Sequence, residues 1–137
     1  MSVRRVLDLI VAGAVWGGVA YLLAGRAFGR SIWPGVLAAP AIGLVVGAVL
    51  QGAFERAARG GRRLISLLSL YGGATLFAVA IGLGSMLGVS PGNRRFPAAL
   101  LEPVIGVWWG LTLTGFVLAL WPVAYLTHWL LEWRAAR

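Results

Sequence analysis

Long apolar segments alternate with short, arginine-containing segments along the whole chain. Four of the apolar segments are long enough to be transmembrane helices, and we place them at about 6–25, 35–57, 63–89 and 98–124. A helix needs about 20 apolar residues to cross about 30 Å of hydrocarbon, and its backbone polar groups are then satisfied within the helix. The pattern therefore predicts an all-α integral membrane protein with a four-transmembrane-helix bundle.

Composition supports a membrane environment over water. Of the 137 residues, 60% are hydrophobic and only 12% are charged, whereas a soluble domain carries about 25% charged residues. The first segment also resembles a secretory signal, because Arg4 and Arg5 precede it. Its apolar run from Leu9 to Gly25 is longer than the ~7–15 residues of a signal h-region, and no clear cleavage site follows. We interpret it as a retained span, with a cleaved signal as the alternative.

All twelve basic residues are arginines, and their distribution predicts an orientation. On the predicted topology, four lie on one side of the membrane, and eight lie on the side that carries both termini and the middle loop: Arg4, Arg5, Arg56, Arg59, Arg62, Arg63, Arg134 and Arg137. The positive-inside rule then places the N- and C-termini in the cytoplasm. The use of arginine alone is compatible with a G+C-rich bacterial genome, and hence with a bacterial inner membrane.

The net charge of +8 raises the question of nucleic-acid binding. The arginines, however, are spread over both sides and lie next to apolar helix ends, and they do not form one basic stripe. We therefore predict contacts with anionic lipid headgroups, chiefly through Arg59, Arg62 and Arg63, and no nucleic-acid partner.

An internal repeat is suggested by two segments, residues 29–47 and 92–110. They share seven identities in nineteen positions: Gly29/Gly92, Pro34/Pro97, Leu37/Leu100, Pro40/Pro103, Ile42/Ile105, Gly43/Gly106 and Gly47/Gly110. Residues 4–10 likewise resemble residues 62–68. We interpret residues 1–61 and 62–137 as parallel two-helix repeats related by a pseudo-twofold axis along the membrane normal. Coincidence in a chain rich in Gly, Ala and Leu is the alternative.

Glycines spaced by four residues predict where helices pack closely. Small residues at this spacing let two backbones approach in lipid, where no hydrophobic force drives helices together. A chain with 20 glycines also produces some of these pairs by chance. The small-residue pairs at this spacing are Gly13/Gly17, Gly43/Gly47, Ala78/Gly82, Gly84/Gly88 and Gly106/Gly110, of which Gly43/Gly47 and Gly106/Gly110 recur within the repeat.

Three prolines predict kinks. Pro40 and Pro103 lie inside the second and fourth spans at equivalent positions of the repeat, where a proline removes a backbone hydrogen bond and bends the helix. The fourth span and its extension, residues 98–137, would be about 60 Å long as a single helix. Since this is about twice the hydrocarbon thickness, we expect a bend at Pro122 and an interfacial C-terminal extension at 125–137.

Aromatic residues recur every fourth position near the C-terminus. The set is Trp121, Tyr125, Trp129 and Trp133. Such side chains favour the headgroup level, which predicts an aromatic belt at the cytoplasmic face. The alternative is a surface for a partner subunit or for a flat pigment or quinone ring.

Candidate chemistry is sparse. With no Cys, the chain has no thiolate nucleophile, no c-type haem attachment and no zinc or iron–sulfur site of the usual kind. His128 is the only histidine, so it cannot form a bis-histidine haem site within one chain. We place it at the membrane interface near Glu132, with ligation of a cofactor as the alternative. No catalytic triad or phosphate-binding loop is present, and we expect no enzyme activity and no resident cofactor or metal.

Acidic residues mark the remaining candidates, since ionisable groups at membrane depth are costly and often functional. We expect Glu55 and Glu132 to form surface ion pairs, and Asp8 to pair with Arg4 or Arg5. Glu102 precedes Pro103 near the start of the fourth span. It either pairs with an arginine of the preceding loop, Arg94 or Arg95, or forms an ion or proton site open to the outer face.

Two functions follow from these features. The first is a non-enzymatic accessory or assembly subunit of a larger membrane complex, since the chain has many features for packing and few for chemistry. The second is a small dimeric transporter or channel that uses Glu102 and the kinked second and fourth helices. Other membrane subunits, or further copies of the chain, are the expected partners.

Overall fold

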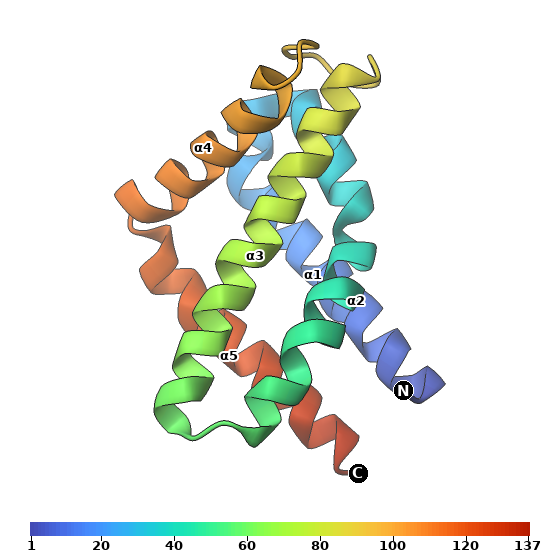
Figure 1. Cartoon of the computed structure of the whole chain (residues 1–137), viewed down its shortest axis with the longest axis vertical. Coiled ribbons are helices and arrows are strands. Elements are labelled where there is room, and N and C mark those ends of the chain that lie inside the picture. The colour runs from blue at the N-terminus through green and yellow to red at the C-terminus, as the bar shows by residue number, and fades with distance from the viewer.

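The computed structural model is all-helical in the part of the chain that it describes. It describes the backbone throughout and every side chain except those of residues 27 and 28. Figure 1 shows the elements in order: α1 (Val3–Phe28), a short 3₁₀ helix η1 (Gly29–Ile32), α2 (Trp33–Arg56), α3 (Arg59–Met86), α4 (Ala98–Leu113) and α5 (Phe116–Ala135). Both termini lie at the end of the molecule that also carries the turn between α2 and α3.

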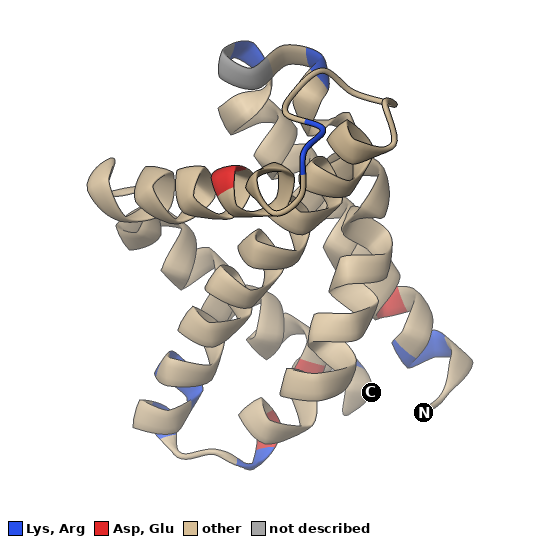
Figure 2. Ribbon diagram, turned by 45° about the horizontal axis from the view of Figure 1, so that its top comes forward, with Lys and Arg blue, Asp and Glu red and all other residues tan. Residues whose placement is uncertain are grey.

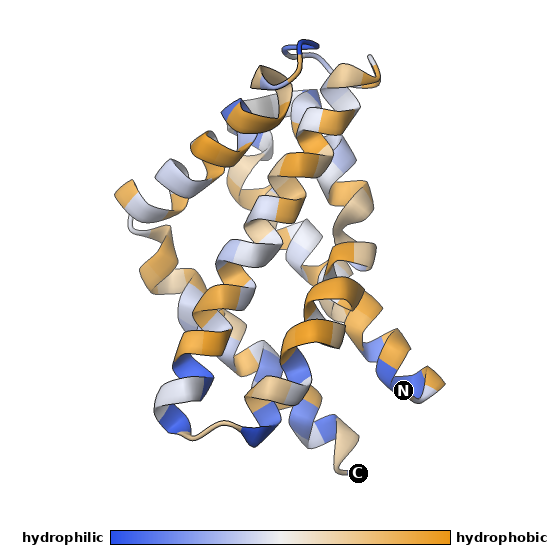
Figure 3. Ribbon diagram, viewed as in Figure 1, coloured by the Kyte–Doolittle hydropathy of each residue, from blue (hydrophilic) through white to orange (hydrophobic). Residues whose placement is uncertain are grey.

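Three helical segments are long and apolar enough to cross a membrane: Val3–Arg26, Gly29–Arg56 and Arg59–Met86. A fourth candidate span consists of α4 and α5 together, which are bent by 95° at the break between them. Hydrophobic residues dominate the middle of the molecule, and hydrophilic ones gather at its two ends (Figure 3). The described part of the chain therefore has three or four helices of membrane-spanning length and composition.

The first hairpin, formed by α1 and α2, is packed backbone against backbone. A Cβ atom built on Gly13 would lie 2.8 Å from the Cα atom of Gly43, and one built on Gly17 would lie 2.6 Å from the Cβ atom of Ala39. Gly47 faces the side chain of Leu9, which is buried. A larger side chain at Gly13 or Gly17 would clash with α2, so these glycines permit direct contact between the two helices.

The second hairpin, formed by α3 and α4, is close at one end and open at the other. Near the connecting loop, a Cβ atom on Gly82 would overlap the carbonyl group of Ala99. Further along α4, a Cβ atom on Gly106 or Gly110 would meet no atom within 4 Å. The two helices therefore diverge as they leave the loop.

The bend in the last apolar region lies at Gly115. This residue has φ of 74°, a left-handed conformation that glycine adopts without steric cost, and it separates α4 from α5. Pro122 lies inside α5, seven residues beyond the bend, so the prediction of a bend at Pro122 is wrong for this 95° break. Pro40 and Pro103 lie inside α2 and α4.

Candidate functional site

A cleft opens between α1 and α4, which make no contact with each other in the described part of the chain. Its volume is about 450 Å³, and all five α-helices line it, which places it within the ~300–1,000 Å³ of typical ligand sites. The lining is almost wholly apolar: Trp16 stands on the α1 side, Phe77 on α3, and Gly106 and Gly110 on α4. His128 of α5 lies at its base.

A buried hydrogen-bond network connects α2, α3 and α5 at this base. The ring of His128 lies 2.6 Å from Gln51 Oε1 through Nδ1 and 2.6 Å from Ser69 Oγ through Nε2. Gln51 Nε2 donates to the carbonyl of His128 at 3.0 Å and to Glu55 Oε1 at 3.2 Å. The side chains of Gln51 and His128 are only 1% and 5% exposed, so these bonds replace those that water would make.

The partners fix the tautomer of the imidazole. Both partners of Gln51 Nε2 are acceptors, which orients the amide so that Oε1 faces His128. Because an amide oxygen only accepts, His128 Nδ1 donates, and Nε2 of a neutral ring then accepts from the Ser69 hydroxyl. Phe54 stacks on the ring with the two centroids 4.9 Å apart. Both ring nitrogens of this histidine are thus engaged by side-chain oxygens.

Three ion pairs occur among the described residues at the end that carries the termini, where Figure 2 shows acidic and basic residues together. Arg5 pairs with Glu55 at 2.8 Å and Arg62 with Glu132 at 2.9 Å. Asp8 pairs with Arg134 at 2.9 Å, so the expectation that Asp8 pairs with Arg4 or Arg5 is wrong. The start of α1 and the end of α5 lie close together in the fold, so Asp8 pairs with an arginine that is far away in sequence.

Arg62 also caps the C-terminal end of α2. It donates to the carbonyls of Glu55 and Ala57, where α2 ends and its last carbonyls lack helical partners. Arg59 and Arg63, the other two predicted lipid contacts, are exposed. The three predicted lipid contacts thus differ: Arg62 is engaged within the protein, whereas Arg59 and Arg63 face outward.

The aromatic series of α5 turns gradually from the interior to the surface. Trp121 donates to the carbonyl of Arg63 and to Ser66 Oγ, and Tyr125 packs edge-on against Phe54. Trp129 and Trp133 are 46% and 41% exposed. Because a helix has 3.6 residues per turn, a four-residue spacing drifts by about 40° at each step, so the series does not form one straight stripe.

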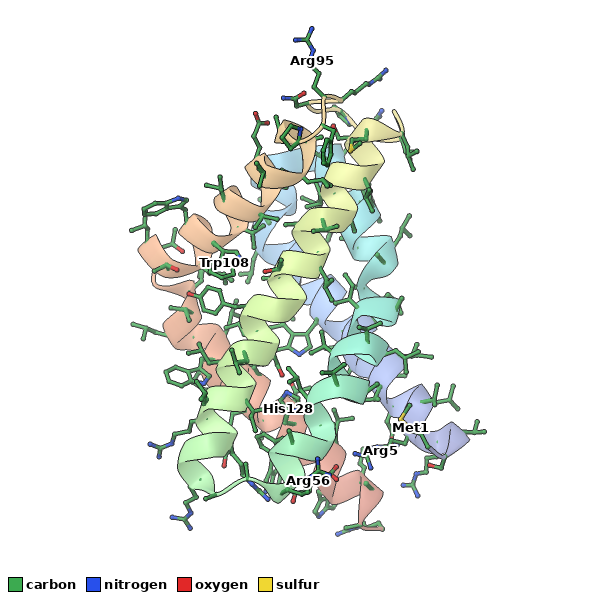
Figure 4. All side chains as sticks on the ribbon, in the orientation of Figure 1. Met1, Arg5, Arg56, Arg95, Trp108 and His128 are labelled. Carbon is green, nitrogen blue, oxygen red and sulfur yellow. The ribbon has the colours of Figure 1, made fainter. Side chains whose placement is uncertain are left out.

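Glu102 lies on the exposed surface of α4 near the α3–α4 loop. Its Oε1 accepts a hydrogen bond of 3.4 Å from Asn93, and the carboxylate is not part of the cleft lining. Neither Arg94 nor Arg95 forms an ion pair with it among the described residues; Arg95 points away from the helices (Figure 4). No cluster of three or more potential metal ligands occurs in the described part of the chain.

Gln51 is a residue of the network that the sequence pattern did not single out, and Ser69 is another. Gln51 is the only glutamine in the chain, lies within an apolar span and precedes Glu55 by four residues, which is one helical turn. A lone amide in such a segment indicates a buried polar partner. The identity of that partner, His128, depends on how α5 folds back.

Comparison of the chain with protein-family models, with curated proteins and with solved structures finds no match in any of the three. Function is therefore inferred from the cleft, from the network at its base and from the charges around it.

Proposed function

We propose that this chain is a non-enzymatic accessory or assembly subunit of a larger complex in a bacterial inner membrane. In this proposal, the cleft between α1 and α4 receives one face of a transmembrane helix from a partner subunit. The partner's side chains fill the cleft, and its backbone lies close to the glycine face of α4.

The observation that carries the proposal is the empty glycine face of α4. The element I-G-x-x-x-G occurs in α2 and again in α4. In α2 its glycines, Gly43 and Gly47, are covered by α1, whereas in α4 Gly106 and Gly110 face the cleft with no atom within 4 Å of a built Cβ. Since helices in lipid associate chiefly through close packing at small residues, the uncovered pair is suited to a second helix.

The polar network supports a scaffolding role. Gln51, Ser69 and His128 bond to one another and tie α2, α3 and α5 together below the cleft. Trp16 Nε1 donates to Thr127 Oγ1 at 3.2 Å and connects α1 to the same assembly. Because these groups satisfy one another, the network holds the cleft walls in place.

The orientation in the proposal follows the charge distribution. Figure 2 shows basic residues at both ends of the molecule, and the end with the termini contains eight of the twelve arginines. The positive-inside rule favours that end in the cytoplasm. Trp129 and Trp133 are exposed at the same end, which suits the headgroup level.

Substitution of Gly110 by Leu tests the proposal. The leucine side chain would occupy the cleft and should abolish co-purification of a fixed partner in mild detergent, while the isolated chain stays folded. Gly18→Leu is the matched control, because Gly18 is also a helical glycine with no atom within 4 Å of a built Cβ but lies outside the cleft. A partner that is retained equally by both variants, or no fixed partner at all, would contradict the proposal.

The break between α4 and α5 favours a second candidate, a small dimeric transporter or channel that uses Glu102. Interrupted helices form ion and substrate sites in many transporters. Under this alternative, the protein purifies as a lone homodimer, and liposomes that contain it show an ion flux that Glu102→Gln abolishes. Glu102 lies outside the cleft lining, and we therefore favour the subunit.

A further inference from the structure

A second hollow lies at the end of the molecule that carries the termini. Its volume is about 480 Å³, and it is bounded by the start of α1, the second half of α2 and the end of α5. The polar residues that line it include Arg4, Arg5, Asp8, Gln51 and Arg134. Figure 4 shows Arg5 on the inner side of the α1 start, facing the region between α1 and the ends of α2 and α5. We refer to it as the arginine pocket.

The pocket carries an excess of positive charge. Three arginines and one acidic residue, Asp8, line it. Arg134 is paired with Asp8, and Arg5 is paired with Glu55 behind the wall. Arg4 forms no ion pair among the described residues. After both ion pairs are counted, the side chains leave one full positive charge unbalanced, and an anion would complement it.

The membrane side of the arginine pocket is apolar. Ala48 and Leu131 line it with side chains that are at least partly exposed, and Leu131 also lines the cleft between α1 and α4. A ligand with its charged group among the arginines would therefore have apolar surface directly beneath it. This succession, from cationic to apolar along the helices, matches an amphiphile better than a free anion.

We propose that the arginine pocket binds one anionic phospholipid of the surrounding bilayer. Arg4 and Arg5 hold the phosphate, assisted by Arg134, and the first part of an acyl chain lies against Ala48 and Leu131. The site differs from general attraction of headgroups to a basic surface, because it takes a single lipid at a defined position. The inference does not depend on the partner helix proposed above.

Native mass spectrometry of the delipidated full chain in detergent tests this proposal. Phosphatidylglycerol and phosphatidylcholine with identical acyl chains are titrated in parallel, and inorganic phosphate is titrated separately. We expect one phosphatidylglycerol to bind in preference to phosphatidylcholine, and inorganic phosphate not to compete at equal concentration. Equal binding of the two lipids, or effective competition by phosphate, would overturn the proposal.

Three variants locate the bound lipid, because they are expected to change its affinity in different directions. Arg4→Gln should weaken phosphatidylglycerol binding about fivefold, the contribution of one basic residue near an anionic lipid. Asp8→Asn should strengthen it, because it removes the only acidic group of the lining and releases Arg134. Arg59→Gln removes the same charge from an exposed residue outside the pocket and should leave binding unchanged. Equal weakening by Arg4→Gln and Arg59→Gln, or weakening by Asp8→Asn, would show that lipid binds to the surface at large.

Discussion

Both helical hairpins contain the element I-G-x-x-x-G, but its glycines are closely packed in the first hairpin and open in the second. In the first hairpin, Gly43 of α2 lies directly against Gly13 of α1. In the second, Gly106 occupies the equivalent place on α4 and faces open space. A glycine pair therefore permits close helix approach but does not enforce it. The residues opposite and beside the glycines decide whether the approach occurs.

Bulky and polar residues hold the second hairpin open. Tyr71 of α3 and Trp108 of α4 pack edge to face with their centroids 5.2 Å apart. Trp108 Nε1 donates to Thr75 Oγ1 at 2.8 Å, and the hydroxyls of Tyr71 and Thr112 lie 2.8 Å apart. Trp108 thus bridges α4 and α3 (Figure 4). In the first hairpin the corresponding space is closed by glycine alone.

The largest expected effect comes from adding one methyl group to each hairpin. Gly43→Ala would drive a Cβ atom into the backbone of Gly13 and should destabilise the isolated chain by about 3 kcal/mol, since overpacking against rigid neighbours costs ~1–3 kcal/mol or more. Gly106→Ala should be neutral or stabilising by up to about 1 kcal/mol, because alanine is the better helix former. Unfolding by SDS in mixed micelles, followed by far-UV circular dichroism, measures both. Equal losses would show that the hairpins are packed alike.

A smaller effect is expected at the bend that ends the second hairpin. Gly115→Ala places an L side chain at φ of 74° without any clash and should cost about 1–2 kcal/mol of backbone strain. Gly72→Ala in α3, which also meets no neighbour, should be neutral or slightly stabilising. The same unfolding assay compares the two variants. Stabilisation by Gly115→Ala would mean that α4 and α5 form one continuous helix.

The smallest effect concerns the bond between Tyr71 and Thr112 that keeps α3 and α4 at a fixed separation. A double-mutant cycle with Tyr71→Phe and Thr112→Val should give a coupling energy of about 0.6 kcal/mol, the average for such bonds in membranes. In the control cycle, Thr114→Val replaces Thr112→Val, because Thr114 bonds within its own helix. The stability effects of Thr114→Val and Tyr71→Phe should be additive. Equal coupling energies in both cycles would show that the bond between Tyr71 and Thr112 does not set the separation of α3 and α4.

The sequence predicts the apolar helices well, because their length and composition are local properties. It also places Glu55 and Glu132 in ion pairs, since arginines are abundant at that end of the chain. The pairing of Asp8 with Arg134 and that of Gln51 with His128 depend on contacts between residues far apart in sequence, which periodicity does not report. The duplication of the two-helix unit stays a prediction.

The position of the bend and the open cleft could not be predicted from the sequence for a related reason. Proline is the stronger local signal for a kink, and the segment contains Pro122, but the helix breaks where Gly115 can take a left-handed conformation. The open face of α4 depends on the wedge formed by Tyr71 and Trp108. This contact joins residues of two different helices, so it cannot be predicted until the relative position of α3 and α4 is known.

Arg62 gives the arginine-only composition a geometric meaning at one position. Its three guanidinium nitrogens reach two carbonyls at the end of α2 and both carboxylate oxygens of Glu132 on α5. A lysine offers three donors on a single nitrogen and cannot cover these separated acceptors at once. The conservative exchange of one cation for the other would therefore leave a helix end or a carboxylate oxygen bonded to water alone, and would loosen the point at which the two hairpins are joined to the last helix.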